Sequence, residues 1–109
     1  MQIRTIGIIG WKEKSLDLAM ALDSIGEWAA SHPEMKFVAL DNLKDLVKRP
    51  IKIVRESAIK KSDLLLAVGG DGTVLSAAHI SLGHKIPILG VNAGHVGFLA
   101  ETRIKALHQ

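Results

Sequence analysis

Three glycines surround a single carboxylate in the segment Gly69-Gly70-Asp71-Gly72-Thr73, directly after the mainly apolar run 63–68. Glycine adopts positive φ angles at little cost and has no Cβ, so such a turn lets backbone N–H groups approach a ligand closely. If a helix follows, its first amides carry a partial positive charge and have no partner within the helix. The segment therefore favours binding of a phosphate or pyrophosphate group.

The carboxylate of Asp71 adds a second chemical requirement to this turn. In a loop that only bound anions it would weaken binding by repulsion, so its presence indicates a role that offsets this cost. Two roles fit: a general base that takes a proton from a hydroxyl, or a ligand of a magnesium ion that bridges phosphates. The sequence contains no dedicated cluster of metal ligands, so we assign no metal-binding residue.

A second glycine-rich turn, residues 90–98, follows the next predicted strand. A strand, helix and strand in this order form a crossover that returns the chain in the same direction, so both turns leave the sheet at one edge. We therefore expect Asp71 and Asn92 to lie at the same edge, within reach of one ligand. Asn92 has two roles open to it, a ligand contact or a hydrogen bond to its own turn.

The elements that would position these turns follow from the spacing of the apolar residues. Continuous apolar runs predict strands that are covered on both faces, which are typical of parallel sheets, and apolar residues three or four positions apart predict amphipathic helices. We expect strands at 3–9, 36–40, 63–68 and 86–91 and helices at 15–31 and 72–82. The fold class is therefore α/β, a Rossmann-like parallel sheet with helices on both faces.

Two segments are harder to interpret. In the helix at 72–82, we expect one packed face made by Val74, Leu75, Ala78 and Leu82, a half-buried His79, and a helix end at Gly83. Residues 41–62 are ambiguous between helix and strand. Their basic residues are interpreted as a solvated helical face, with steering of an anionic nucleotide as the alternative; these are Lys44, Lys48, Arg49, Lys52, Arg55, Lys60 and Lys61.

Composition limits the class of protein. The 109 residues are expected to form a single domain, and 48% of them are hydrophobic, which is enough for a core. The absence of cysteine fits a reducing compartment, and the lack of a long apolar span predicts a soluble, cytoplasmic protein with no membrane partner. A net charge of +3 with two Phe and two Trp does not favour nucleic acid as a partner.

Neither common nucleotide fingerprint is present. There is no Gly-x-x-x-x-Gly-Lys-Ser/Thr segment, and the pair Gly7 and Gly10 is too short for Gly-x-Gly-x-x-Gly. Ordinary P-loop NTPases and dehydrogenases are therefore set aside.

The first turn resembles the motif shared by NAD kinases, diacylglycerol-type lipid kinases and 6-phosphofructokinases. The second turn distinguishes among them, because residues 92–99 resemble the Asn-x-Gly-x-x-Gly-Phe-Leu signature of NAD kinases. Lipid kinases typically continue the first motif with Asn-Glu, whereas this chain has Val74-Leu75. The resemblance extends from the first strand almost to the end of the chain.

This resemblance implies transfer of a phosphoryl group from ATP or polyphosphate to the 2′-hydroxyl of the adenosine ribose of NAD, which gives NADP. From the chemistry of phosphoryl transfer we expect a divalent cation, Mg²⁺, as cofactor. Asp71 would accept the proton, Gly72 would bring its backbone close to the dinucleotide, and Phe98 would pack near the adenine. The residues expected to bind substrate or donor are Gly69, Gly70, Asp71, Gly72, Thr73, Asn92, Gly94 and Phe98.

NAD kinases also have a β-rich carboxy-terminal domain that completes the site and supports oligomers, and this domain is not encoded in residues 1–109. We therefore expect an amino-terminal part of a longer, homo-oligomeric enzyme, with little or no activity by itself. Two alternatives remain: a lipid or sugar kinase of the same superfamily, and a non-catalytic nucleotide-binding module.

Overall fold

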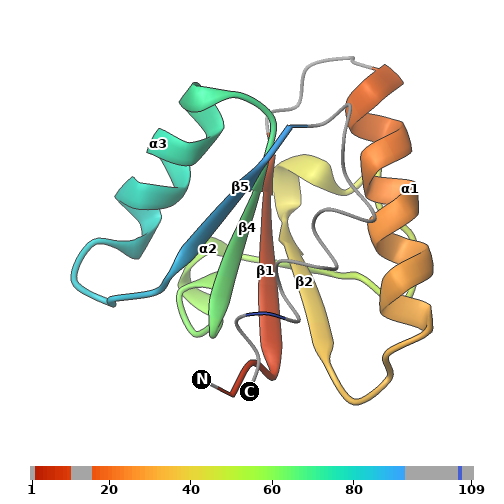
Figure 1. Cartoon of the computed structure of the whole chain (residues 1–109), viewed down its shortest axis with the longest axis horizontal. Helices are drawn as coiled ribbons and strands as arrows, with labels where there is room; N and C mark the ends of the chain where they lie inside the picture. The colour runs from red at the N-terminus through yellow and green to blue at the C-terminus, as the bar shows by residue number, and fades with distance from the viewer. Residues whose placement is uncertain (1, 11–15, 93–105, 107–109) are drawn as a thin grey trace.

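The computed structural model describes residues 2–10, 16–92 and 106. Within these ranges the chain forms a five-stranded sheet of order β3-β2-β1-β4-β5, and each pair of neighbouring strands is parallel (Figure 1). The strands are β1 (Thr5–Gly10), β2 (Lys36–Leu40), β3 (Lys52–Val54), β4 (Leu64–Val68) and β5 (Ile88–Val91). The predicted α/β class with a parallel sheet is confirmed.

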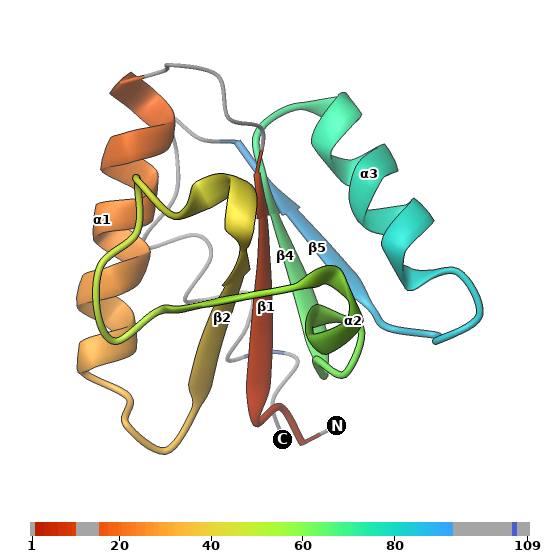
Figure 2. The same cartoon turned by 180° about the vertical axis from the view of Figure 1, so that it is seen from behind.

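Helices cover both faces of the sheet, as Figures 1 and 2 show. Helix α1 (Leu16–Ala30) covers one face, while α2 (Glu56–Ile59) and α3 (Asp71–Ser81) cover the other; a 3₁₀ turn, η1 (Asp41–Leu43), follows β2. This arrangement follows from the alternation of side chains along each strand. In β1, Ile6 and Ile8 belong to the cluster of α1, whereas Ile9 belongs to the cluster of α2 and α3.

The central strand β4 is buried along its whole length. Leu64, Leu66 and Val68 pack on the α1 face, and Leu65 and Ala67 pack on the α3 face. The unbroken apolar run therefore corresponds to a strand with two covered faces, as the sequence predicts.

Strand and helix boundaries differ from the prediction by at most two residues, and β2 has the predicted bounds. The first strand begins at Thr5 although Ile3 is also buried, and the last begins at Ile88. The ambiguous segment 41–62 contains η1, β3 and α2. Its basic side chains are exposed apart from half-buried Lys60, so they are solvated as expected, but they do not form one helical face.

The packed face of α3 differs from the predicted one. Thr73, Ala77 and Ile80 are buried against the sheet, whereas Leu75 and Leu82 are 71% and 70% exposed. His79 is exposed and not half-buried. The helix ends as expected, with Gly83 at φ +80°.

No helix in residues 2–10, 16–92 or 106 has the length and apolar character needed to cross a bilayer.

Candidate functional site

The sheet reverses its strand order between β1 and β4. From β1 the chain continues outward to β2 and β3, and it then returns to build β4 and β5 on the other side. In open parallel sheets, ligands bind beyond the carboxyl ends of the strands at such a point. The first glycine turn follows β4 here, so the topology places it where a ligand site is expected.

Gly69 has the backbone geometry that makes this turn possible. Its φ is +146°, a region that favours glycine, and a Cβ on it would lie 2.5 Å from Thr73 Oγ1. Its N–H donates to the carbonyl oxygen of Val91 at 2.9 Å, which joins the turn to the end of β5. Both the φ value and the close approach therefore require a residue without a side chain.

Gly70 caps α3 in an extended conformation, and its carbonyl oxygen accepts the N–H groups of Thr73 and Val74 at 3.1 and 3.4 Å. Helix α3 therefore begins at Asp71, at the carboxyl edge of the sheet. The amides of Asp71 and Gly72 have no acceptor within the helix, and the helix dipole adds a partial positive charge there. This is the geometry expected for binding a phosphate.

The predicted site residues of the first turn differ in their solvent exposure. Asp71 is the first residue of α3, and its side chain lies outside the described part of the structure. Gly70 and Gly72 are exposed and Gly69 is half-buried. Thr73 is only 1% exposed, so it lies beneath the turn.

The second turn begins at the same edge as the first. Val68 and Val91 are register partners at the ends of β4 and β5, so Gly69 and Asn92 leave the sheet side by side. The expectation that both turns leave the sheet at one edge is therefore confirmed, and Asn92, directly after β5, is exposed. Gly94 and Phe98 lie outside the described residues.

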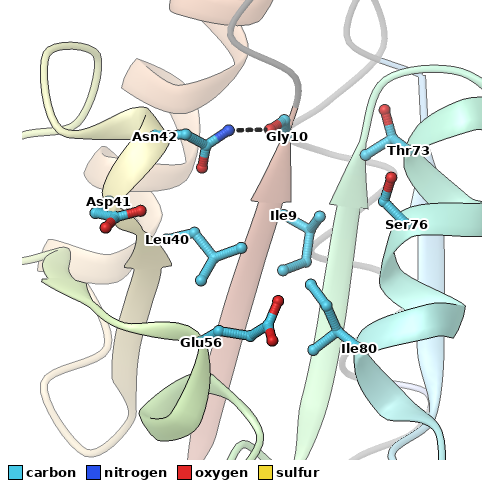
Figure 3. A pocket seen from close by; sticks show the side chains of 9 residues that line it. All are labelled: Ile9, Gly10, Leu40, Asp41, Asn42, Glu56, Thr73, Ser76 and Ile80. Atoms are coloured by element: carbon cyan, nitrogen blue, oxygen red, sulfur yellow. Dashed lines mark hydrogen bonds between the residues drawn. The ribbon is translucent and has the colours of Figure 1, made fainter.

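A pocket of about 340 Å³ that the sequence analysis missed lies on the other side of the α3 N-terminus, over the ends of β1 and β2 (Figure 3). Its lining residues come from β1, β2, η1, α2 and α3, and they are Ile9, Gly10, Leu40, Asp41, Asn42, Glu56, Thr73, Ser76 and Ile80. The apolar members form its floor, and the polar members surround them.

Asn42 joins η1 to the end of β1 across this pocket. Its Nδ2 donates to the carbonyl oxygen of Gly10 at 2.8 Å, and its Oδ1 is buried with no hydrogen-bond partner among the described residues. Thr73 Oγ1 is likewise buried and unpartnered within that part of the chain. Ser76 donates to the carbonyl oxygen of Gly72 at 3.1 Å. A polar residue two positions after the strand, at the carboxyl edge, is the sequence signal that could have identified Asn42.

The acidic groups of the pocket lie at its rim. Asp41 and Glu56 are exposed, and Glu56 pairs with Lys60 at 3.7 Å. The described residues hold no group of three or more His, Cys, Asp or Glu side chains that could bind a metal ion.

A parallel sheet with a glycine turn and a helix N-terminus at its switch point defines a nucleotide-binding α/β domain. Residues 12–109 match the family described as "ATP-NAD kinase N-terminal domain". The chain belongs to the NAD kinase family, which sets aside the lipid and sugar kinases considered above.

Relatives support this assignment. The chain is 31% identical over 103 residues to an NAD kinase of Heliobacterium modesticaldum, covering 94% of this chain and 36% of the relative. It is 32% identical over 110 residues to an NAD kinase of Nitrosomonas europaea, covering 97% and 36%. The chain thus spans little more than a third of these relatives.

A solved structure supports the fold. The crystal structure of a yeast NADH kinase complexed with NADH superposes with a TM-score of 0.75 at 20% identity, covering 98% of this chain and 37% of that one. At this identity the likeness concerns the arrangement of strands and helices.

Proposed function

We propose that this chain is the amino-terminal, nucleotide-binding part of an NAD kinase that transfers a phosphoryl group from ATP or polyphosphate to the 2′-hydroxyl of the adenosine ribose of NAD. The observation that carries this proposal is the position of Asp71. It is the first residue of α3, at the carboxyl edge of the sheet, beside the strand end from which Asn92 continues.

In this function each part of the turn has a separate task. The ribose oxygen attacks the terminal phosphorus of the donor, the bond from that phosphorus to the leaving oxygen breaks, and the hydroxyl proton goes to the carboxylate of Asp71. The amides at the start of α3 stabilise negative charge on the phosphates. Because the transition state of phosphoryl transfer is loose, positioning and charge neutralisation supply most of the catalysis.

When bound, magnesium supplies further neutralisation of the donor phosphates. The residues proposed to contact dinucleotide or donor are Gly69, Gly70, Gly72, Thr73, Asn92, Gly94 and Phe98.

We further propose that the part of the enzyme beyond these residues completes the site, since the chain covers about 36% of the length of its relatives. The 109 residues alone are then expected to phosphorylate NAD far more slowly than the full-length enzyme.

The test is Asp71→Asn in the full-length enzyme, assayed by NADP formation and by NAD binding. We expect kcat to fall by about 100- to 10,000-fold, the usual contribution of a general base, while NAD binding persists. Asp23→Asn, an exposed carboxylate on α1, is the matched control and should leave kcat unchanged. Unchanged turnover of Asp71→Asn would refute the role of Asp71 and favour a non-catalytic nucleotide-binding module.

A further inference from the structure

Helix α3 is apolar on two sides, and only one of them packs on the sheet. A second apolar row runs along the flank of the helix and the residue after it, at four-residue spacing, and its members are Val74, Ala78 and Leu82. Leu82 is 70% exposed, Val74 is exposed and Ala78 is half-buried. A helix that is apolar on several sides is normally covered on all of them, so this outer row indicates a surface on which another part of a protein packs.

The outer row of α3 lies beside the open edge of the sheet. A Cβ on Gly90 would lie 2.9 Å from Val74 Cγ2, so the row begins against β5. Strand β5 is the last strand of the sheet within residues 2–10 and 16–92, and α3 runs alongside it (Figures 1 and 2). The apolar row and the strand edge therefore form one continuous surface, which we call the α3–β5 surface.

The backbone of β5 presents hydrogen-bonding groups on this surface. The carbonyl oxygens of Pro87 and Val91 accept bonds from the β4 side, each at 2.9 Å. Successive peptide groups of a strand point to opposite sides, so the N–H groups of Ile88 and Gly90 point away from β4, where the described part of the chain has no further strand. Parallel sheets are normally covered, and an open edge is a template for pairing with another segment.

The charge around the α3–β5 surface defines the chemistry of its occupant. Residues 72–92 contain no Asp or Glu, and their basic residues are Lys85 and the exposed His79 and His84. The surface therefore suits an apolar contact with a neutral or acidic margin.

The topology indicates where further elements of a longer chain would lie. Crossovers between parallel strands are right-handed, and consecutive elements are usually neighbours in space. The step from β1 to β2 places α1 on one face of the sheet, and the step in the opposite direction, from β4 to β5, places α3 on the other. A further step beyond β5 in the same direction would put a strand on the open edge and a helix beside α3, on the side of Val74.

We propose that the α3–β5 surface is the docking surface for an apolar part of the same enzyme that lies beyond these 109 residues. The chain covers 36% of the length of its relatives, so most of the relatives' length lies outside it. The inference rests on the proposed function, which takes the chain as the amino-terminal part of a longer enzyme. It adds which surface the rest of that enzyme covers.

The main test measures the accessibility of single cysteines in the full-length enzyme. Residues 1–109 contain no cysteine, so Leu82→Cys can be followed by maleimide labelling and mass spectrometry of its peptide. Met20→Cys is the matched control, because Met20 is also a large apolar residue, 58% exposed, but lies on α1 on the opposite face. Relative to the same chain in urea, we expect labelling at Leu82→Cys to be slowed by about tenfold or more beyond that at Met20→Cys. Equal protection of the two cysteines would overturn the proposal.

Amide hydrogen exchange tests the strand edge without any substitution. The N–H groups of Leu89 and Val91 point toward β4, whereas those of Ile88 and Gly90 point to the open edge. In the full-length enzyme we expect all four amides to exchange at similar, slow rates, as resolved by NMR. Fast exchange at Ile88 and Gly90 with slow exchange at the other two would contradict coverage of this edge.

Dilution distinguishes the rest of the same chain from a second copy of the enzyme. Contact within one chain does not depend on protein concentration, so the protection of Leu82→Cys should persist over a dilution of about a hundredfold. Loss of protection on dilution would assign the α3–β5 surface to an interface between copies and overturn the proposal.

Failure of the kinase function would be recognised separately, because labelling and exchange need no turnover. A full-length protein that forms no NADP refutes the proposed function. Protection of Leu82→Cys in that same protein would still support the docking surface, and its absence would overturn it.

Discussion

The side-chain amide of Asn42 donates a 2.8 Å hydrogen bond to the carbonyl oxygen of Gly10 and so links η1 to the end of β1, across 32 residues of sequence. Gly10 is buried, so its carbonyl oxygen depends on a protein partner. Asn42 therefore links η1 to β1 at the carboxyl ends of the strands, and its Oδ1 lies on the side of the pocket (Figure 3).

Asn42→Ala should lower the free energy of unfolding by about 1–3 kcal/mol, because it leaves a buried acceptor unpaired. Asn42→Asp should cost more, since it places a carboxylate oxygen against the Gly10 carbonyl. Urea denaturation of the full-length protein measures both changes, and exposed Asp41→Ala is the control, expected within about 0.5 kcal/mol of wild type. Equal stability of Asn42→Ala and the control would show that water replaces the bond.

Gly69→Ala should destabilise the protein by about 1–3 kcal/mol, because alanine is strained at φ +146° and its Cβ would meet Thr73 Oγ1. The neighbouring Gly70 is a matched control. It has φ −100° and open space at the Cβ position, so Gly70→Ala should cost less than about 1 kcal/mol. Thermal denaturation distinguishes the two variants, and similar losses in both would argue against the described turn.

Gly90 allows α3 to approach β5, since a Cβ on it would lie 2.9 Å from Val74 Cγ2. Gly90→Ala should therefore cost about 1–3 kcal/mol through overpacking. Adding Val74→Ala removes the clash. The loss of unfolding free energy in the double variant should therefore be smaller than the sum of the two single losses, by about 0.5 kcal/mol or more. Additive effects in this double-mutant cycle would show that the two residues do not touch.

Asp63 ties the start of β4 to the start of β1. Its Oδ2 accepts the backbone N–H groups of Arg4 and Thr5, each at 2.9 Å. Asp63→Ala should cost about 1.5–3 kcal/mol, the range for hydrogen bonds to a charged group, and Asp63→Asn should cost less because one oxygen acceptor remains. Exposed Asp23→Ala serves as the reference in the same denaturation series. A loss from Asp63→Asn as large as that from Asp63→Ala would assign the effect to charge alone.

The sheet could be predicted from the sequence because its central strands are buried on both faces. The run Leu64–Val68 has no polar residue, and the apolar residues of α1 recur at helical spacing. In both segments the burial pattern can therefore be predicted from neighbouring residues alone. The edge strand β3 was ambiguous because only three residues pair there, and two of them are exposed.

The packed face of α3 could not be predicted from spacing. Two sets of residues have helical spacing in this segment, and hydrophobicity favours the predicted one. The packed set is Thr73, Ala77 and Ile80, and the predicted set is Val74, Leu75, Ala78 and Leu82. The backbone of Gly69 and Gly70 sets the direction in which the helix begins, and it turns the first set toward the sheet.

The glycine turns of the candidate site could be predicted because their residues are contiguous. The pocket could not, since Asn42 and Glu56 come from a segment without a motif. They meet Thr73 and Ser76 only after the sheet has assembled.

The reversal of strand order between β1 and β4 has a consequence for cooperativity. One wall of the pocket comes from the first half of the chain, through η1, and the other from the second half, through α3. Any ligand bound there would contact residues from both halves of the chain, and would slow amide hydrogen exchange in both at once.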